Sequence, residues 1–225
     1  MSPEERKQSA VELRERFLRL TESVQPDVIF EIGANEATFS RAARIAVPGA
    51  KMFAFEASPV NHARFKDVPE LHGVEYINMA ATDHDGSIEF HLQQTRNGKP
   101  VPSTAGSNSI LSRIGDVKTV PCTVPCTSVE SWVGKHGLTG TMVAWIDVEG
   151  ATREVLVGMG DVIKSFAAFH IEVELVRYWH GQWLYGDVLK HMVERGFSPI
   201  ARDHEFAHQH NVIFVRDDLR EKLGG

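Results

Sequence analysis

The stretch VIFEIGAN, residues 28–35, is an apolar run that ends in an acid and then breaks at a glycine. Its β-branched and aromatic side chains predict a buried strand over 28–32, and the residues that follow predict a helix over 38–46. Gly33 lets the chain reverse between the two, and it lets backbone N–H groups approach a nucleotide-like ligand beyond the carboxyl end of the strand. Glu31 would then face an ammonium group. The alternative is a capped turn between a strand and a helix that binds nothing.

The elements predicted around this turn alternate between strand and helix. Further strands are expected at residues 51–55, 74–78, 87–93, 117–124, 142–148, 166–173, 197–200 and 211–215, and further helices at 3–20, 61–67, 128–136, 152–159 and 185–195. Parallel neighbours need crossover connections, so this order predicts an α/β fold with a mostly parallel sheet and helices on both faces. The last strand has no crossover helix before it, and we expect it to run antiparallel.

Length and composition fit one globular domain. The 225 residues, 42% hydrophobic and 24% charged, suffice for one sizeable core. We therefore expect a single domain over 1–225. Within it, residues 1–25 are expected to form a peripheral N-terminal helix. Residues 95–114 are rich in Gly, Pro, Ser, Thr and Asn and have the composition of a lid loop.

The net charge and the cysteines indicate which binding partners and which cellular compartment to expect. A net charge of −6 leaves no global basic footprint, so nucleic acid is not an expected partner. Neither a signal peptide nor a membrane span is recognisable, and we expect a cytoplasmic protein. Cys122 and Cys126 would lie about 13 Å apart on an extended strand, too far for a disulfide. Two small apolar side chains on one face of a strand explain them.

Acids also follow the next two strands. Glu56, in FEASP, comes about twenty residues after the first turn, a spacing that suits a carboxylate accepting both hydroxyls of a ribose. Asp83 lies in the polar turn after the third strand, where it is a candidate for binding an adenine amino group or simply a turn-forming residue. The fingerprint G-x-G-x-x-G is absent after Gly33, which disfavours NAD.

A third group of acids ends the strands predicted at 142–148 and 166–173. Asp147 and Glu149 lie at the tip of the first of these, and His170, Glu172 and Glu174 share one face of the second. Buried ionisable groups are costly unless they are paired or ligated, so we take Asp147, His170 and Glu172 as candidate catalytic residues. The same three side chains have the donor types that suit Mg²⁺ or Mn²⁺. The alternative is a structural role, in which these acids pair with Arg153 or Arg177 or cap the backbone.

Together these motifs resemble the FkbM-type S-adenosylmethionine-dependent methyltransferases. The resemblance rests on EIGAN at 31–35, EASP at 56–59 and, most specifically, IDVEGA at 146–151 followed by VLVG at 155–158, and it spans residues 27–175. It implies the Rossmann-like class I methyltransferase fold, with seven strands and a reversed last strand. It also implies S-adenosylmethionine as cofactor and O-methylation of a hydroxyl, on a sugar or a secondary metabolite.

By position, the resemblance assigns Glu31 to the methionine amine, Glu56 to the ribose and Asp83 to the neighbourhood of the adenine, with Gly33 and Ala34 passing beneath the cofactor. The full set of expected cofactor-binding residues is Glu31, Gly33, Ala34, Asn35, Glu56, Ala57, Ala80, Asp83 and Asp147. Two positions depart from the family pattern, which has Asp at the place of Glu31 and glycine at the place of Ala37.

The leading hypothesis is an O-methyltransferase acting on a hydroxyl of a sugar, glycolipid or secondary metabolite, with a small molecule or glycan as its expected substrate. Such an enzyme must hold the oxygen in line with the methyl group and remove its proton, with Asp147 or His170 as base. A bound Mg²⁺ or Mn²⁺ could instead lower the pKa of the hydroxyl. The alternatives are a cofactor-binding sensor or scaffold without turnover and, after that, a nucleotide-sugar or NAD enzyme.

Overall fold

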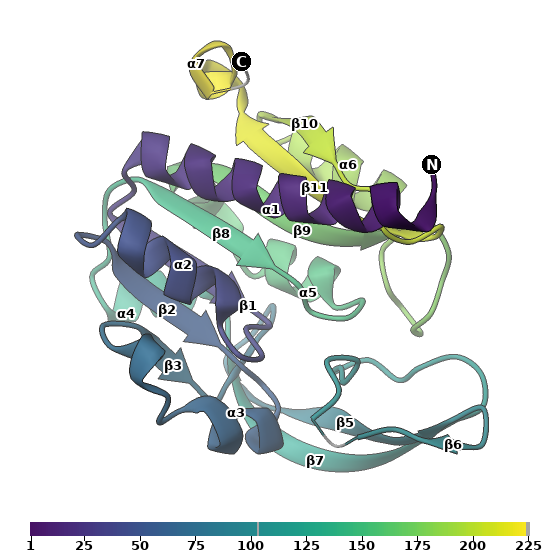
Figure 1. Cartoon of the computed structure of the whole chain (residues 1–225). Helices are drawn as coiled ribbons and strands as arrows, with labels where there is room; N and C mark the ends of the chain where they lie inside the picture. The colour runs from purple at the N-terminus through teal and green to yellow at the C-terminus, as the bar shows by residue number, and fades with distance from the viewer. Residues whose placement is uncertain (103, 224–225) are drawn as a thin grey trace.

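The computed structural model describes residues 1–102 and 104–223, and its centre is a seven-stranded sheet (Figure 1). The strands lie in the order β10-β11-β9-β8-β1-β2-β3. Their bounds are β1 (Val28–Ile32), β2 (Lys51–Phe55), β3 (Glu75–Ile77), β8 (Met142–Ile146), β9 (Phe166–Glu174), β10 (Phe197–Arg202) and β11 (Gln209–Arg216). β1 pairs in parallel with β2 and β8, whereas β11 runs antiparallel to both of its neighbours. The mostly parallel sheet with a reversed last strand is thereby confirmed.

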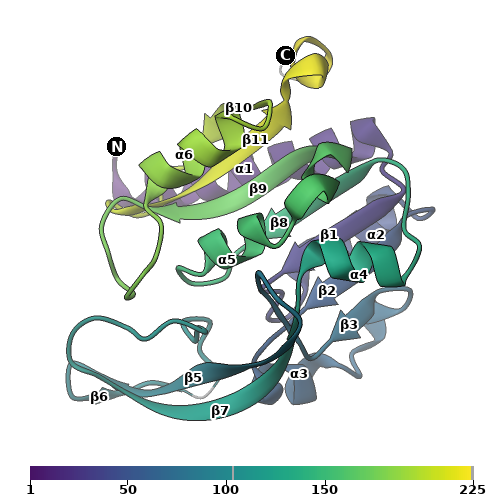
Figure 2. The ribbon, with the colours of Figure 1, turned by 180° about the vertical axis from the view of Figure 1, so that it is seen from behind.

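Helices cover both faces of this sheet, as the sequence predicts. α1 (Pro3–Val24) and α2 (Thr38–Ala46) lie on one face (Figure 1), and α4 (Val129–Lys135), α5 (Thr152–Val157) and α6 (Tyr185–Val193) lie on the other (Figure 2). Strand residues alternate between the two faces. In β1, Phe30 therefore packs in the core beneath α4 and α5, while Ile29 packs beneath α1 and α2.

The first helix begins at a capping box. The Ser2 hydroxyl accepts a hydrogen bond from the backbone N–H of Glu5, and the Glu5 carboxylate accepts one from the N–H of Ser2. α1 extends to Val24, four residues past its predicted end. Along it, Leu13, Phe17 and Leu20 are buried, and they join the core that lies against the sheet.

A second, four-stranded sheet is a feature that the sequence analysis does not predict. It has the order β4-β7-β5-β6, from β4 (Ala80–Ala81), β5 (Gly86–Arg96), β6 (Lys99–Pro100) and β7 (Val117–Thr127). The strands expected at 87–93 and 117–124 pair with each other as a long antiparallel ribbon, which extends below the carboxyl ends of the central strands (Figure 1). Cys122 and Cys126 both lie on β7 as free thiols, in one small apolar cluster.

The remaining elements are short. They are α3 (Pro59–Phe65), η1 (Pro69–Leu71), η2 (Gly160–Ser165), η3 (Asp217–Leu219) and α7 (Arg220–Leu223). The segment expected to be a lid loop, 95–114, includes the end of β5 and all of β6, and its residue 103 lies outside the described residues. Across the described chain, no helix has the length and apolarity that a membrane crossing requires.

Candidate functional site

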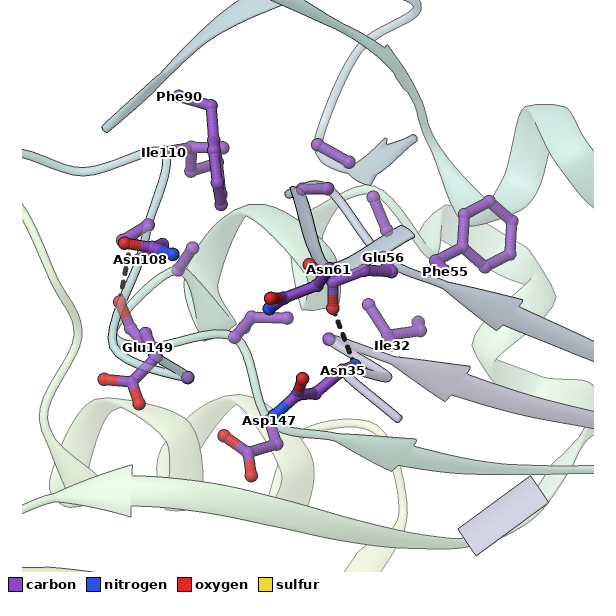
Figure 3. Close-up of a pocket in the computed structure, with 18 of the residues that line it drawn as sticks. Ile32, Asn35, Phe55, Glu56, Asn61, Phe90, Asn108, Ile110, Asp147 and Glu149 are labelled. Carbon is purple, nitrogen blue, oxygen red and sulfur yellow. Dashed lines mark hydrogen bonds between the residues drawn. The ribbon is translucent and has the colours of Figure 1, made fainter. Parts of the chain in front are cut away.

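A pocket of about 720 Å³, partly open to solvent, lies at the carboxyl ends of β1, β2 and β8 (Figure 3). Ligands of open α/β sheets bind at this edge. Six of the nine expected cofactor-binding residues line it: Gly33, Asn35, Glu56, Ala57, Ala80 and Asp147. The long ribbon and the loop before β7 supply the opposite wall, with Phe90 and Ile110 as its larger apolar side chains. The pocket therefore combines a polar floor of strand ends with an apolar cover.

The turn after β1 is held against two neighbouring strands. The backbone N–H groups of Gly33 and Ala34 both donate to the carbonyl of Phe55, at 2.9 and 2.8 Å. Gly33 has φ +81°, and a Cβ atom at this position would overlap the backbone carbonyl of Asp147. Only glycine fits here, because both the backbone angle and the space exclude a side chain.

Two further residues of the turn adopt the left-handed backbone. Asn35 has φ 46° and Ala37 has φ 53°. Left-handed conformations are disfavoured for residues with a Cβ atom, Asn being among the more tolerant. Ala37 stands where the family pattern has glycine, and it keeps the backbone conformation that glycine adopts without strain. Alanine in place of glycine at position 37 is therefore compatible with a left-handed backbone in this turn.

Glu31 lies beneath the turn and caps the next helix. Its carboxylate accepts hydrogen bonds from the N–H groups of Phe39 at 3.1 Å and Ser40 at 2.7 Å, at the start of α2. Burial raises the pKa of Glu31 to about 7. The residue lines a second hollow, on the α1 side of the sheet, together with Ala34. Gly33, Asn35 and Asp147 line both spaces, so the two adjoin at the turn.

Glu56 holds the turn from the other side. Its carboxylate accepts hydrogen bonds from the N–H of Asn35 at 2.6 Å and of Ser58 at 2.7 Å, and the first of these is drawn in Figure 3. Burial raises its pKa to about 7. Beside it, Asn61 of α3 is 2% exposed and lines the pocket, and its Oδ1 has no hydrogen-bond partner among the described residues. An unpaired buried acceptor at a pocket wall suits a ligand that donates a hydrogen bond.

The acids at the ends of β8 and β9 meet at one corner of the pocket. Trp145 pairs with His170 across the two strands, which brings Asp147 opposite Glu172. One carboxylate oxygen from each of Asp147, Glu149 and Glu172 lies within 4.8 Å of the others. Glu149 follows β8 with φ 52°, and the Ser109 hydroxyl donates to its carbonyl at 2.8 Å. The hydrogen bond from Ser109 therefore holds the backbone of Glu149 in place.

Burial raises the pKa values of all four acids in this corner, and repulsion by neighbouring carboxylates adds to the shift of Glu149, Glu172 and Glu174. The pKa of Asp147 rises to about 6 through burial, opposed by a hydrogen bond with Glu172. Burial and the Asp147 charge raise the pKa of Glu149 to about 8 and that of Glu174 to about 7. The pKa of Glu172 lies well above its ordinary value for the same reasons. The hydrogen bond between the two residues lowers the pKa of Asp147 and raises that of Glu172, which makes Glu172 the donor and Asp147 the acceptor.

These shifts predict that the ligand-free protein loses stability between about pH 6.5 and pH 8.5. A carboxyl with a raised pKa binds more protons when folded, so the free energy of unfolding falls as pH rises through its folded value. Glu31, Glu56, Glu149 and Glu174, with pKa values of about 7 to 8, all titrate in this window. Their combined effect should lower the thermal midpoint by about 3 °C or more.

Thermal unfolding across this pH range, in a chelating buffer, measures the effect. Buried histidines act in the opposite direction below about pH 6.5, because burial lowers the pKa of His170 and His191 and both are protonated on unfolding. The test is therefore confined to the range above their ordinary pKa of 6.5. A midpoint that rose or stayed level up to pH 8.5 would contradict the assigned shifts.

The structure separates His170 from this corner. Its ring stacks on Trp145, with centroids 3.4 Å apart, and lies 5.6 Å from the ring of Phe17 on α1. It is 1% exposed, and neither ring nitrogen has a hydrogen-bond partner among the described residues. The alternation of β9 does put His170 on the same face as Glu172, but two residues further from the strand end and therefore inside the core. His170 is not among the residues that line the pocket.

Asp83 also lies away from the pocket. Its carboxylate is 2.9 Å from Nδ1 of His84 in the exposed turn after β4. Met79, Ala80 and Ala81, which precede that turn, line the pocket instead. At this edge the pocket is thus lined by small and apolar side chains that lie a few residues before Asp83 in the chain.

Several residues that line the pocket are not predicted from the sequence, above all those of the loop before β7. Asn108 accepts a hydrogen bond from the N–H of Gln93 at 2.8 Å, and Ser109 forms a bridge with His91 of β5. These ties fold the loop over the pocket, where Asn108 and Ser109 line the wall. Their small polar side chains mark a loop in the sequence, but the strand that anchors them is known only once β5 and β7 pair.

Residues 31–199 match the family model described as the methyltransferase FkbM domain. The chain belongs to the FkbM methyltransferase family. As a member it is an S-adenosylmethionine-dependent methyltransferase, and the resemblance seen in the sequence is confirmed.

Two curated relatives share part of the sequence. The 2-O-methyltransferase NoeI of Sinorhizobium fredii (strain NBRC 101917 / NGR234) is 24% identical over 180 residues, which cover 77% of this chain and 74% of that protein. The 31-O-demethyl-FK506 methyltransferase FkbM of Streptomyces tacrolimicus is 26% identical over 167 residues, which cover 64% of each chain.

One solved structure shows the fold. The magnesium protoporphyrin IX methyltransferase ChlM from Synechocystis PCC 6803, with bound SAM, superposes with a TM-score of 0.50 at 10% identity, covering 95% of this chain and 82% of that one. This likeness confirms the class I, Rossmann-like methyltransferase fold.

Proposed function

We propose that this methyltransferase transfers the methyl group to a hydroxyl of a sugar, glycolipid or secondary metabolite. The observation that carries the proposal is the position of Asp147, which lines the pocket and belongs to the cluster of acids with Glu149 and Glu172. Methylation of a hydroxyl requires removal of its proton, and a carboxylate at this edge can accept it. The printed names of both curated relatives describe methylation at an oxygen.

The acceptor we propose is a small molecule or a glycan rather than a nucleic acid. Four acids border the proposed acceptor side, the half-buried Asp147 and Glu149 and the buried Glu172 and Glu174, and the chain carries a net charge of −6. Such a corner repels a phosphate backbone. A neutral hydroxyl compound, in contrast, can donate hydrogen bonds to carboxylates there.

The pocket residues fit S-adenosylmethionine, which supplies a methyl group already activated by its sulfonium. Glu56 is the residue we assign to the ribose hydroxyls, because its carboxylate lies at the pocket wall with two backbone donors already bound. Asn61 offers an unpaired Oδ1 to a donor on the cofactor. Phe90, Ile110 and Met79 provide the apolar surface that an aromatic base requires. Gly33 leaves the floor of the pocket without a side chain.

The chain's own task in the reaction is to hold the acceptor oxygen and take its proton. With a pKa of about 6, Asp147 is largely ionised at neutral pH and can act as a base. Glu172, which donates a hydrogen bond to it, is a positioning residue that keeps the carboxylate oriented. His170 lies in the core, so of the two candidate bases we retain Asp147.

A methyl-transfer assay with a panel of acceptors tests the proposed function. Labelled S-adenosylmethionine is offered with free sugars, a glycolipid and hydroxylated aglycones, and in parallel with amines and thiols. We expect label on oxygen only. Transfer confined to nitrogen or sulfur would contradict the proposal, and S-adenosylhomocysteine binding without transfer to any acceptor would favour a cofactor-binding sensor or scaffold.

The ribose assignment predicts that Glu56→Gln weakens S-adenosylhomocysteine binding by about ten- to a hundredfold. The change keeps the shape but removes a charged acceptor and puts an amide among two backbone donors, a loss of about 1.5 to 3 kcal/mol. Calorimetric titration gives the two dissociation constants. The control is Glu75→Gln, an exposed acid on β3 outside the pocket. Equal affinities in the two variants would remove Glu56 from the ribose.

A further inference from the structure

We propose that Asp147, Glu149 and Glu172 together bind one divalent cation, Mg²⁺ or Mn²⁺, at the carboxyl ends of β8 and β9. One oxygen from each residue lies within 4.8 Å of the others. Oxygens around Mg²⁺ lie about 3 to 4 Å from one another at bond lengths near 2.1 Å. A small inward rotation of the side chains would therefore complete three positions of a coordination shell.

Unpartnered buried oxygens supply independent support. Oε1 of Glu172 and Oε1 of Glu174 have no hydrogen-bond partner among the described residues, although the two side chains are only 8% and 1% exposed. Glu174 is not one of the three ligands, but it lies on the same face of β9 as Glu172. Leaving a carboxyl oxygen buried without a hydrogen-bond partner is costly, and a coordinated cation would supply such a partner.

The charge balance of the corner points the same way. Among the described residues, the ion pairs within 4.0 Å include none of the four acids Asp147, Glu149, Glu172 and Glu174. The guanidinium of Arg113 lies over the rings of Trp179 and Tyr178, at 4.6 and 5.6 Å from their centroids. Arg113 and Arg96 act on Glu149 from a distance, but in the described chain neither forms an ion pair within 4.0 Å with an acid of the cluster, so a divalent cation would supply the direct charge partner that these carboxyls lack.

Hydrogen bonds hold the backbone at each of the three proposed ligands. Asp147 directly follows β8, and its N–H donates to the carbonyl of Ile32 at 2.9 Å. The Thr152 hydroxyl donates to the carbonyl of Glu172 at 3.3 Å, and the Ser109 hydroxyl fixes that of Glu149. In Figure 3 the Asp147 and Glu149 carboxylates lie on the same side of the pocket, with Glu56 on another. The cation would thus border the acceptor side, apart from the proposed ribose residue.

The chemistry of the donors selects the ion. Three carboxylates with no nitrogen or sulfur ligand suit hard cations that keep some water, namely Mg²⁺ and Mn²⁺. The proposal deepens the proposed function and its catalytic part rests on it, since a hydroxyl bound to the cation becomes more acidic.

Manganese binding to the cofactor-free protein tests the site without relying on methyl transfer. Purified full-length chain is stripped with a chelator and titrated with MnCl₂, and free Mn²⁺ is measured by electron paramagnetic resonance. We expect one Mn²⁺ per chain, and an upward shift of the thermal midpoint with MnCl₂ that the chelator reverses. Glu149→Gln and Glu172→Gln should each weaken binding at least tenfold, whereas Glu75→Gln should leave it unchanged.

If Glu172→Gln does not fold, Glu149→Gln carries the test, because its side chain follows β8 and is not part of a strand. Absence of bound Mn²⁺ at millimolar concentration, or equal binding in Glu149→Gln and Glu75→Gln, would overturn the site. Full methyl transfer by the chelated protein would overturn its catalytic part and leave the proposed function intact. Failure of every acceptor, with Mn²⁺ still bound by this trio, would sink the proposed function alone.

Discussion

Gly33→Ala should prevent stable folding, or lower the free energy of unfolding by about 4 kcal/mol or more, a loss outside the ordinary range for a single substitution. The reason is a backbone clash. The added Cβ would overlap the carbonyl of Asp147, and both residues are held by hydrogen bonds to the main chain of neighbouring strands. The turn after β1 cannot move away without separating β1 from β8 at the pocket.

Gly196→Ala is a matched control for this substitution. Gly196 has the same φ of +81°, and nothing lies within 4 Å of the place where its Cβ would stand. Its replacement should cost only the strain of a left-handed alanine, about 1 to 2 kcal/mol. Urea denaturation of the two variants and the wild type gives the comparison. Equal losses would show that backbone strain alone, rather than the contact with Asp147, makes glycine necessary at position 33.

The centre of the fold could be predicted closely from the sequence. The predicted strands 28–32 and 51–55 and the predicted helix 38–46 have the bounds that the structure shows for β1, β2 and α2. In this region apolar β-branched runs alternate with an amphipathic segment, and Gly33 separates them sharply. Local pattern and tertiary packing agree here, so residue-by-residue reasoning succeeds.

The pairing of strands that lie far apart in the sequence could not be predicted. The strands at 87–93 and 117–124 could be recognised, but their union in a separate ribbon depends on hydrogen bonds across an intervening loop. For the same reason Asn108 and Ser109 could not be placed at the pocket, since their position depends on Gln93 and His91 in that ribbon. A contact between segments leaves no periodic signal in either segment alone.

The sequence also does not show how far a residue lies from the end of its strand. The alternation of β9 correctly puts His170 and Glu172 on one face, yet only Glu172 reaches the acid cluster. Strand 142–148 was expected to continue to Val148, whereas β8 ends at Ile146. Because β8 ends at Ile146, Asp147 directly follows the strand. Glu149 then lies outside the strand, where its backbone adopts the left-handed conformation.

Asp147→Asn should lower turnover by about a hundredfold or more while S-adenosylhomocysteine affinity changes little. Loss of a positioned acid or base costs about 10² to 10⁴ in rate. The substitution keeps the shape of the side chain, and its Oδ1 can still accept the hydrogen bond from Glu172. The backbone N–H of residue 147 continues to donate to Ile32. Folding and the turn around Gly33 should therefore survive, and the loss should be confined to chemistry.

Two measurements separate this outcome from a general defect. Calorimetry with S-adenosylhomocysteine reports the cofactor side of the pocket, and initial rates on an acceptor found in the panel report kcat and KM. The control is Asp161→Asn, whose carboxylate is exposed and pairs only with Lys164 at 2.6 Å, so that its rate should equal that of the wild type. Undiminished kcat in Asp147→Asn would exclude Asp147 from catalysis.

Chelation of the wild type then distinguishes the two roles of Asp147. If its carboxylate acts through a bound cation, the stripped wild type should fall to the rate of Asp147→Asn, and Mn²⁺ should restore the wild type but not the variant. If the carboxylate acts as a base alone, chelation should leave the wild-type rate unchanged and only the substitution should abolish it. Both roles draw on the same placement, a carboxylate at the end of β8 that lies within 4.8 Å of carboxylate oxygens from Glu149 and Glu172. Removing its charge should therefore stop methyl transfer by either route.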